Sequence, residues 1–200
     1  MLITRLEVTD KSKVNVYIDD EYAFPLYVKD VEKFQLIEGQ EIPTGIYEEL
    51  ITDIVLSRAK QKALQILKFM DRTEFELRRK LSDAGYPVNI IDDTISYVYE
   101  YGYLNDERFA SNYIRLRKDR KSKQVIKSEL ITKGMNKRIL DEIFTAEYSQ
   151  EEDDPEETAI KKAIAKKISD PSTLTWEEKQ KLIASLYRKG FDIEKIKRFI

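Results

Sequence analysis

The sequence predicts a mostly α-helical chain of tandem three-helix repeats in an elongated array, after a small N-terminal segment that contains a β-hairpin (α+β). Three observations support this fold class. Apolar residues alternate with polar ones only near the N-terminus, and from about residue 46 onward their spacing is helical. One arrangement of apolar residues around a glycine occurs three times. Charged residues make up 36% of the 200 residues, which suits thin helical modules with long solvent-facing sides.

The N-terminal segment has the period of β-strands. Two alternating runs flank the polar stretch "TDKSK" and predict a β-hairpin, and they place on one face Leu2, Thr4, Leu6 and Val8 in the first strand and Val14, Val16 and Ile18 in the second. A third short strand is expected at residues 22–26, where Pro25 restricts it to an edge of the sheet.

Helical spacing begins after these strands. The stretch "VKDVEKFQLIEG" predicts a short helix that stops near Gly39. Residues 46–70 contain neither Gly nor Pro and predict one long helix, because a helical stripe joins Leu50, Ile54, Ala59, Ala63, Leu67 and Met70.

The internal repeat is centred on Gly85, Gly134 and Gly190. Relative to each glycine, apolar residues stand at positions −8, −4, +1, +6 and +10, as in Leu77, Leu81, Tyr86, Ile91 and Ile95; Ile126, Leu130, Met135, Leu140 and Phe144; and Leu182, Leu186, Phe191, Ile196 and Ile200. This pattern predicts one helix that ends at a left-handed Gly and another that follows it. Each pair is preceded by a first helix, expected at about 57–70, 107–119 and 156–168. Capping boxes are expected at Thr73 with Glu76 and at Thr175 with Glu178.

These elements divide the chain into four parts. We predict a β-rich segment at 1–56 and three-helix repeats at 57–105, 106–148 and 149–200. The acidic stretch at 149–157 and the turn-rich stretch at 169–175 are interpreted as solvated connectors.

The composition argues against catalysis. The chain has no Cys and no His, which excludes disulfides, thiolate ligands, histidine bases and the catalytic triads built on them. It has no phosphate-binding glycine loop, and its adjacent carboxylates point about 100° apart on a helix. We therefore expect no enzyme, no cofactor and no metal. No apolar run approaches the roughly 18 residues of a membrane span, and the N-terminus is unlike a signal peptide, so we expect a monomeric cytoplasmic protein.

The charge is unevenly distributed, although the net charge is only −2. Residues 108–138 contain eleven Lys and Arg but only two acids, Asp119 and Glu129, a net charge of +9. Local pairs four residues apart cannot balance that charge. We interpret the segment as a surface that binds nucleic acid or an acidic protein groove; the alternative is an ordinary solvated face. Its dense part holds Arg115, Arg117, Lys118, Arg120, Lys121, Lys123 and Lys127.

The stretch "YGYLNDERFASNYIRLR" is expected to join two repeats. Asn105 or Asp106 should cap the following helix. The buried stripe of that helix is predicted to contain Phe109, Tyr113 and Leu116. For the tyrosines at 97, 101 and 103 we expect packing between repeats, with stacking on nucleic-acid bases as the alternative.

This joint, with "RAKQKALQIL" and "DRTEFELRRKLSDAGYP" before it, resembles the RecX regulatory protein family, the modulators of the bacterial RecA recombinase. The resemblance is closest at 57–145, extends to "VYIDDEYAFPL", and is looser in the third repeat. It implies a repeat array that lies along the groove of the RecA filament on DNA and inhibits ATP turnover, recombination and co-protease activity. The residues themselves are equally compatible with capping of filament ends. Longer members continue beyond the position of Ile200.

The resemblance also implies a contact surface on the basic face of the repeats. The candidates on this chain are Arg72, Arg78 and Arg79 in the first repeat and Arg108, Arg115, Arg117, Arg120, Lys121, Lys123 and Lys127 in the second. Two other functions stay open: a helical module that binds nucleic acid directly, without RecA, and a scaffold for another acidic protein partner.

Overall fold

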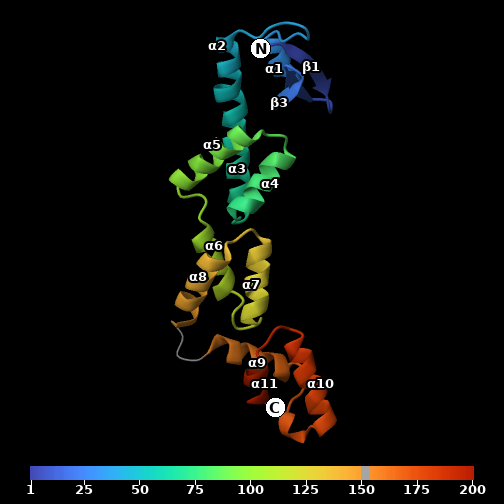
Figure 1. Cartoon of the computed structure of the whole chain (residues 1–200), viewed down its shortest axis with the longest axis vertical. Coiled ribbons are helices and arrows are strands. Elements are labelled where there is room, and N and C mark those ends of the chain that lie inside the picture. Colours follow the sequence, from blue (N-terminus) through green and yellow to red (C-terminus); the bar gives the residue numbers. More distant parts are fainter. Residues whose placement is uncertain (150–153) are drawn as a thin grey trace. The chain divides into compact units, whose positions relative to one another are not determined.

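The computed structural model describes residues 1–149 and 154–200 (Figure 1). These residues form two compact units, Met1–Leu104 and Asn105–Ile200, and each is described by itself. The first unit contains the β-strands and the first three-helix repeat, and the second contains the other two repeats. The predicted fold class, a mostly helical chain with an N-terminal sheet, is confirmed.

The first unit begins with a three-stranded antiparallel sheet in the order β1 (Ile3–Val8), β2 (Lys13–Ile18) and β3 (Glu21–Tyr27). As predicted, β3 is an edge strand and holds Pro25. The turn between β2 and β3 consists of Asp19 and Asp20, both with positive φ (49° and 68°). Two successive left-handed residues make the tight turn that matches the twist of a hairpin. The turn is also anchored from outside, because the Leu2 N–H donates to Asp19 Oδ1 at 2.9 Å.

The predicted face of the first strand is right at Leu6, which packs against the core, and wrong at its two ends. Ile3 is buried, whereas Leu2 and Val8 are exposed. A register irregularity between Ile3 and Arg5 interrupts the alternation, and such a bulge moves side chains to the other face of a strand. The second strand behaves as predicted, since Val14 and Val16 are buried.

The next helix, α1 (Val28–Lys33), is shorter than predicted, because Phe34 caps it and Gln35 has a φ of 51°. Gly39 instead belongs to a later turn, in which its N–H donates to the Ile3 carbonyl at 2.8 Å. Within α1, Asp30 is buried and accepts two hydrogen bonds from Arg58, at 2.5 and 2.8 Å. Although burial acts to raise the pKa of Asp30, these bonds and one from the Tyr27 N–H lower it.

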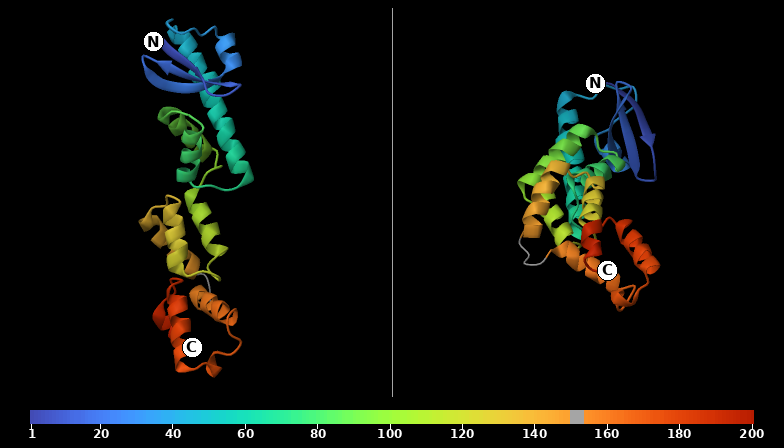
Figure 2. Two further views of the ribbon diagram at one scale, coloured as in Figure 1. Left: turned by 90° about the vertical axis from the view of Figure 1, so that its right-hand side faces the viewer. Right: turned by 60° about the horizontal axis from the view of Figure 1, so that its bottom comes forward.

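The predicted long helix runs from Thr44 to Phe69 as α2 (Thr44–Glu49), a π-helical segment η1 (Leu50–Leu56) and α3 (Ser57–Phe69). The sheet lies beside this helix in both Figure 1 and Figure 2. The core between them is apolar and contains Val16, Phe24, Leu26, Leu36, Ile42, Leu50, Val55, Ala59 and Ile90. The boundary proposed at residues 56 and 57 lies inside this continuous helical run.

The first repeat is completed by α4 (Glu74–Asp83) and α5 (Val88–Glu100). The predicted capping box at Thr73 and Glu76 is present. Gly85 has a φ of 91°, the left-handed conformation predicted for it. The apolar stripe faces inward as predicted, and each fully buried Leu contributes about 1.5–3 kcal/mol relative to an exposed one. This core contains Ala63, Leu77, Leu81, Ile91, Ile95, Val98 and Leu104.

The second unit opens with α6 (Asp106–Arg115), α7 (Lys123–Thr132) and α8 (Lys137–Ser149). Asn105 caps α6, since its side chain accepts from the Arg108 N–H at 2.7 Å. The predicted stripe of α6 is wrong at Leu116, which is 73% exposed. Phe109 and Tyr113 are half-buried and pack against the core, whose fully buried residues on this helix are Ala110 and Ile114. The helix also ends at Arg115, four residues before the predicted end.

The third repeat consists of α9 (Pro155–Ala165), a 3₁₀ turn η2 (Pro171–Thr173), α10 (Trp176–Tyr187) and α11 (Ile193–Lys197). The predicted capping box at Thr175 and Glu178 is present. The acidic stretch is more than a connector, because Asp154 caps α9 and both Pro155 and Glu156 are buried. Residues 150–153 of that stretch lie outside the described part.

Gly190 shows why a glycine is required at the repeat position in this third repeat. Its φ is 78°, and a Cβ placed on it would lie 2.8 Å from Ser122 Oγ. Ser122 is itself held in place, because its hydroxyl donates to the Lys189 carbonyl at 2.8 Å. A larger residue at position 190 would therefore be strained in its backbone and would displace the Ser122 hydroxyl from its bond between the second and third repeats.

The tyrosines at the end of the first repeat contact one another. Tyr97 is half-buried, with its ring centroid 4.7 Å from that of Tyr101. Tyr101 and Tyr103 are 61% and 49% exposed, and packing of these rings between repeats stays a prediction.

Candidate binding surface

The basic cluster of the second repeat lies on a turn between two helices. After α6 ends at Arg115, backbone hydrogen bonds from the N–H groups of Arg120 and Lys121 to the Arg117 carbonyl, both 2.9 Å, fold the chain into a tight turn. The Ser122 hydroxyl then caps α7 by accepting from the Val125 N–H at 3.3 Å. The candidate side chains therefore project from fixed positions rather than from a long loop.

Arg115 and Lys118 bind the last turn of α8. Arg115 forms two hydrogen bonds with the Glu147 carboxylate, at 2.6 and 2.9 Å, and Glu147 is only 3% exposed. The Lys118 ammonium, also buried, donates to the Glu147 carbonyl at 3.1 Å. The carboxylate raises the pKa of Arg115, so the guanidinium stays charged. Both cations hold the repeat together.

A second set of contacts centres on Glu129 of α7. It accepts from Lys121 at 2.5 Å and from the Tyr113 hydroxyl at 2.9 Å. Arg117 lies over the Tyr113 ring, 3.6 Å from its centroid, a cation–π geometry. Burial acts to raise the pKa of Glu129, but the bonds from Lys121 and Tyr113 outweigh it and the pKa is lowered.

Part of the charge of the basic segment is balanced by acids that lie outside it, and, as expected, these are not pairs four residues apart. Lys127 forms an ion pair with Asp141 of α8, which lowers the pKa of Asp141. Asp141 and Glu147 both lie on α8. They are 14 and 32 residues away in sequence from the cations that they bind, Lys127 and Arg115. The positive charge is balanced through tertiary packing, and a search for pairs four residues apart in the sequence does not detect such contacts.

Arg120, Lys123 and Arg108 differ in exposure. Arg120 is exposed, and within the described residues it has no ion pair. Lys123 is half-buried, with its ammonium 5.3 Å from the Tyr148 ring centroid and 5.6 Å from that of Phe144. Arg108 is exposed on the first turn of α6.

In the first repeat, Arg78 is engaged and Arg79 is available. Arg78 contacts Glu74 and Asp92, each at 2.6 Å, and these carboxylates raise its pKa. Arg72 lies 3.9 Å from Glu76. Arg79 is exposed and forms no ion pair with any residue that the structure describes.

Sequence reasoning missed a set of cations in the third repeat. An open hollow of about 740 Å³ is lined by Arg120 together with Lys162, Lys166, Lys167 and Lys189. The segment 149–200 has equal numbers of acidic and basic residues, so its summed charge concealed this grouping. The spacing of Lys162 and Lys166, four apart on one helix face, was the available signal.

Within 1–149 and 154–200, no group of acidic residues could hold a metal ion. Over the same residues, none of the helices has the length and apolar character needed to cross a membrane. The arrangement offers charged contacts and hydrogen-bond donors.

The fold and these contacts define a class of protein: a tandem three-helix-repeat protein with an N-terminal sheet and exposed basic side chains on its helical turns. Four family models match the chain in order. They are the regulatory protein RecX N-terminal domain at residues 1–43 and the first, second and third three-helix domains of RecX at 59–97, 105–142 and 155–200.

Relatives align with nearly the whole of this chain. The chain belongs to the RecX family. The regulatory protein RecX of Caldanaerobacter subterraneus subsp. tengcongensis is 33% identical over 99% of this chain and 98% of its own. That of Clostridium acetobutylicum is 32% identical over 97% and 92%. Both are named as regulatory proteins.

Two crystal structures share the fold. One, of a regulatory protein RecX, matches 98% of both chains with a TM-score of 0.60 and 21% identity. The other, of RecX from Lactobacillus salivarius, has a TM-score of 0.59 and 24% identity, over 72% of this chain and 93% of its own.

Proposed function

We propose that this chain is a non-enzymatic regulator that binds the filament of the RecA recombinase on DNA and inhibits its ATPase, recombination and co-protease activities. The observation that carries the proposal is the ordered match of all four RecX segments along one chain. By this proposal the protein acts as a monomer in the cytoplasm, where it tunes DNA repair, recombination and the SOS response.

The contact surface in this proposal is the set of basic residues on the repeats. We assign the direct contacts first to Arg79 and Arg120, because both are exposed and have no ion pair among the described residues. Arg78, Arg115, Lys121 and Lys127 act mainly by fixing the repeats, since each is paired with a carboxylate. Arg72, Arg108, Arg117 and Lys123 complete the surface.

Filament binding can be measured by sedimentation. RecA is assembled on single-stranded DNA with a slowly hydrolysed ATP analogue and pelleted with increasing amounts of the chain. We expect the chain to enter the pellet until it saturates, and to stay in the supernatant when RecA is omitted, since a short DNA strand alone does not sediment. A chain that stays in the supernatant at every RecA concentration would exclude filament binding.

A further inference from the structure

A basic groove lies at the junction of the second and third repeats. The hollow of about 740 Å³ adjoins a second one of about 180 Å³, and the two share Arg120, Lys189 and Phe191. We call the combined depression the junction groove. No carboxylate lines it, and six cations do: Arg120, Lys121, Lys162, Lys166, Lys167 and Lys189.

Four of these six cations, Arg120, Lys166, Lys167 and Lys189, have no acidic partner among the described residues; the other two, Lys121 and Lys162, pair with Glu129 and Asp119. Arg120, Lys166 and Lys189 are exposed. Lys162 lies 3.3 Å from Asp119, a pair that is half-exposed on both sides, and Lys167 donates to the Ser185 hydroxyl at 2.6 Å. A groove of this kind keeps a positive field that attracts a polyanion.

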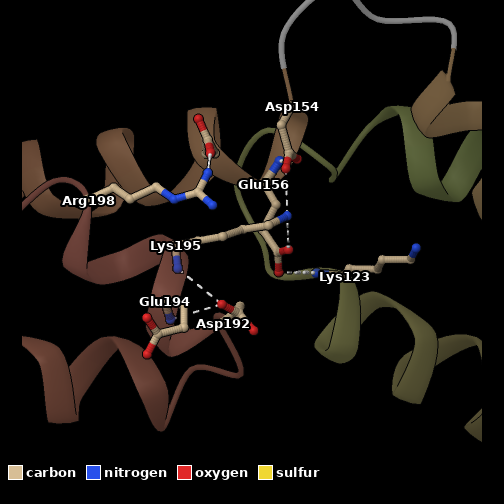
Figure 3. Close-up of polar contacts among 8 residues, drawn as sticks. Lys123, Asp154, Glu156, Asp192, Glu194, Lys195 and Arg198 are labelled. Atoms are coloured by element: carbon tan, nitrogen blue, oxygen red, sulfur yellow. Dashed lines mark hydrogen bonds and ion pairs between the residues drawn. The ribbon is translucent and has the colours of Figure 1, made fainter.

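The two walls of the groove are held together by polar contacts between the repeats (Figure 3). Glu156, only 7% exposed, accepts from the Lys123 N–H at the start of α7 at 3.3 Å. Within the third repeat, the Lys195 ammonium bridges Glu156 and Asp154, at 3.0 and 2.5 Å, and so holds Glu156 in place. The Ser122 hydroxyl adds a second contact between the repeats, its bond to the Lys189 carbonyl. These contacts fix the backbone positions from which the cations project.

The lining indicates what kind of polyanion fits. Five of the six cations are Lys, which binds phosphate as a point charge, whereas Arg is preferred where a carboxylate is held by two parallel bonds. The floor is apolar, with Ala159, Ala163 and a buried Phe191, so it offers no exposed ring on which a base could stack. This combination favours contact with a backbone and no base preference.

We propose that the junction groove binds the sugar-phosphate backbone of single-stranded DNA, without sequence preference. This goes beyond the filament regulation proposed above, because it requires binding when RecA is absent. It also adds Lys162, Lys166, Lys167 and Lys189 to the functional surface.

The test compares two variants that each lose three charges: K162Q/K166Q/K189Q in the groove and K137Q/R138Q/K181Q on exposed positions outside it. Binding of a fluorescent mixed-sequence DNA strand is measured at several salt concentrations. Each lost contact to a single strand should reduce the slope of log K against log salt by about 0.7, so the groove variant should lose about 2 in slope. At about 0.1 M salt this corresponds to about 100-fold weaker binding.

The slope of the control variant should differ from that of the parent chain by no more than about 0.7, the value expected for one contact. The midpoint of thermal unfolding should be unchanged in both variants. Equal binding by the two variants, or no binding by the parent chain, would overturn the proposal. A polyglutamate peptide of equal charge is measured in parallel. If it bound more tightly than DNA and lost affinity only in the groove variant, the groove would be a site for an acidic peptide. Normal filament sedimentation with lost DNA binding by the groove variant would support the groove independently of the regulatory proposal.

Discussion

Reversing two accessible charges, as R79E/R120E, abolishes inhibition of RecA ATP hydrolysis while helical circular dichroism stays unchanged. Neither Arg79 nor Arg120 has an ion pair in the described chain, so the reversal leaves no buried acid unpaired. It does place two negative charges against a surface selected for positive ones, and like charges across an interface are strongly unfavourable. We expect the concentration for half-inhibition to rise by about 100-fold.

The matched control for this pair is K68E/K181E. It also reverses one exposed lysine in each compact unit, at positions outside the candidate surface. We expect it to inhibit like the parent chain. Inhibition by R79E/R120E at parental concentrations would show that these two arginines are not contacts, and equal loss in both variants would mean that only the total charge matters.

Arg115 requires a different experiment, because R115E destabilises the second unit as well as changing the surface: its side chain is 53% exposed, but its partner Glu147 is buried. The change puts a second carboxylate beside Glu147, which is 3% exposed and receives both bonds from Arg115. Leaving a buried charge without its partner is strongly destabilising. We expect the midpoint of thermal unfolding to fall by at least ~10 °C.

Two further variants show whether repulsion is the cause. R120E makes the same substitution on an exposed side chain without an ion pair among the described residues, so its midpoint should stay within about 2 °C of the parent. R115E/E147Q removes the second charge and should recover most of the loss. If R115E melted at the parental temperature, the ion pair would contribute nothing to stability, and Arg115 would return to the list of direct contacts.

Much of the fold was predictable because its signals are local. A glycine that must be left-handed, with apolar residues at fixed offsets, located the second and third helices of every repeat, and Leu81, Leu130 and Leu186 are all fully buried. A helical stripe and its capping residue can be predicted from neighbouring positions alone, without knowing which distant residues they contact. The same holds for Thr73 and Thr175 as caps.

The errors arose where a small residue fills the core or where a local irregularity changes which side chains are buried. In α6 the large residues Phe109 and Leu116 suggested the buried stripe. Phe109 does pack against the core, but Leu116 is exposed and the fully buried residues are Ala110 and Ile114. The bulge in β1 moved Ile3 into the core, and an alternating pattern cannot represent an extra residue. At these positions, neither the size of the side chain nor strict alternation along the strand predicts which residues are buried.

The candidate surface was the least predictable part. Its residues were identified from the local excess of Lys and Arg. The structure shows which of them form ion pairs, because their acidic partners, such as Glu147 and Asp141, lie far away in the sequence. The cations of the junction groove were missed for the related reason that Arg120 and Lys166 come together only through tertiary packing. Charge counts over a segment cannot reveal such groupings.

The most direct test of the central claim is the rate of ATP hydrolysis by RecA on single-stranded DNA, measured against increasing amounts of this chain. The DNA is kept in excess, so that binding of free strands by the junction groove cannot lower the rate. The account predicts that hydrolysis falls to a low plateau as the chain saturates the filament. An unchanged rate at concentrations at which the chain sediments with RecA filaments would contradict it.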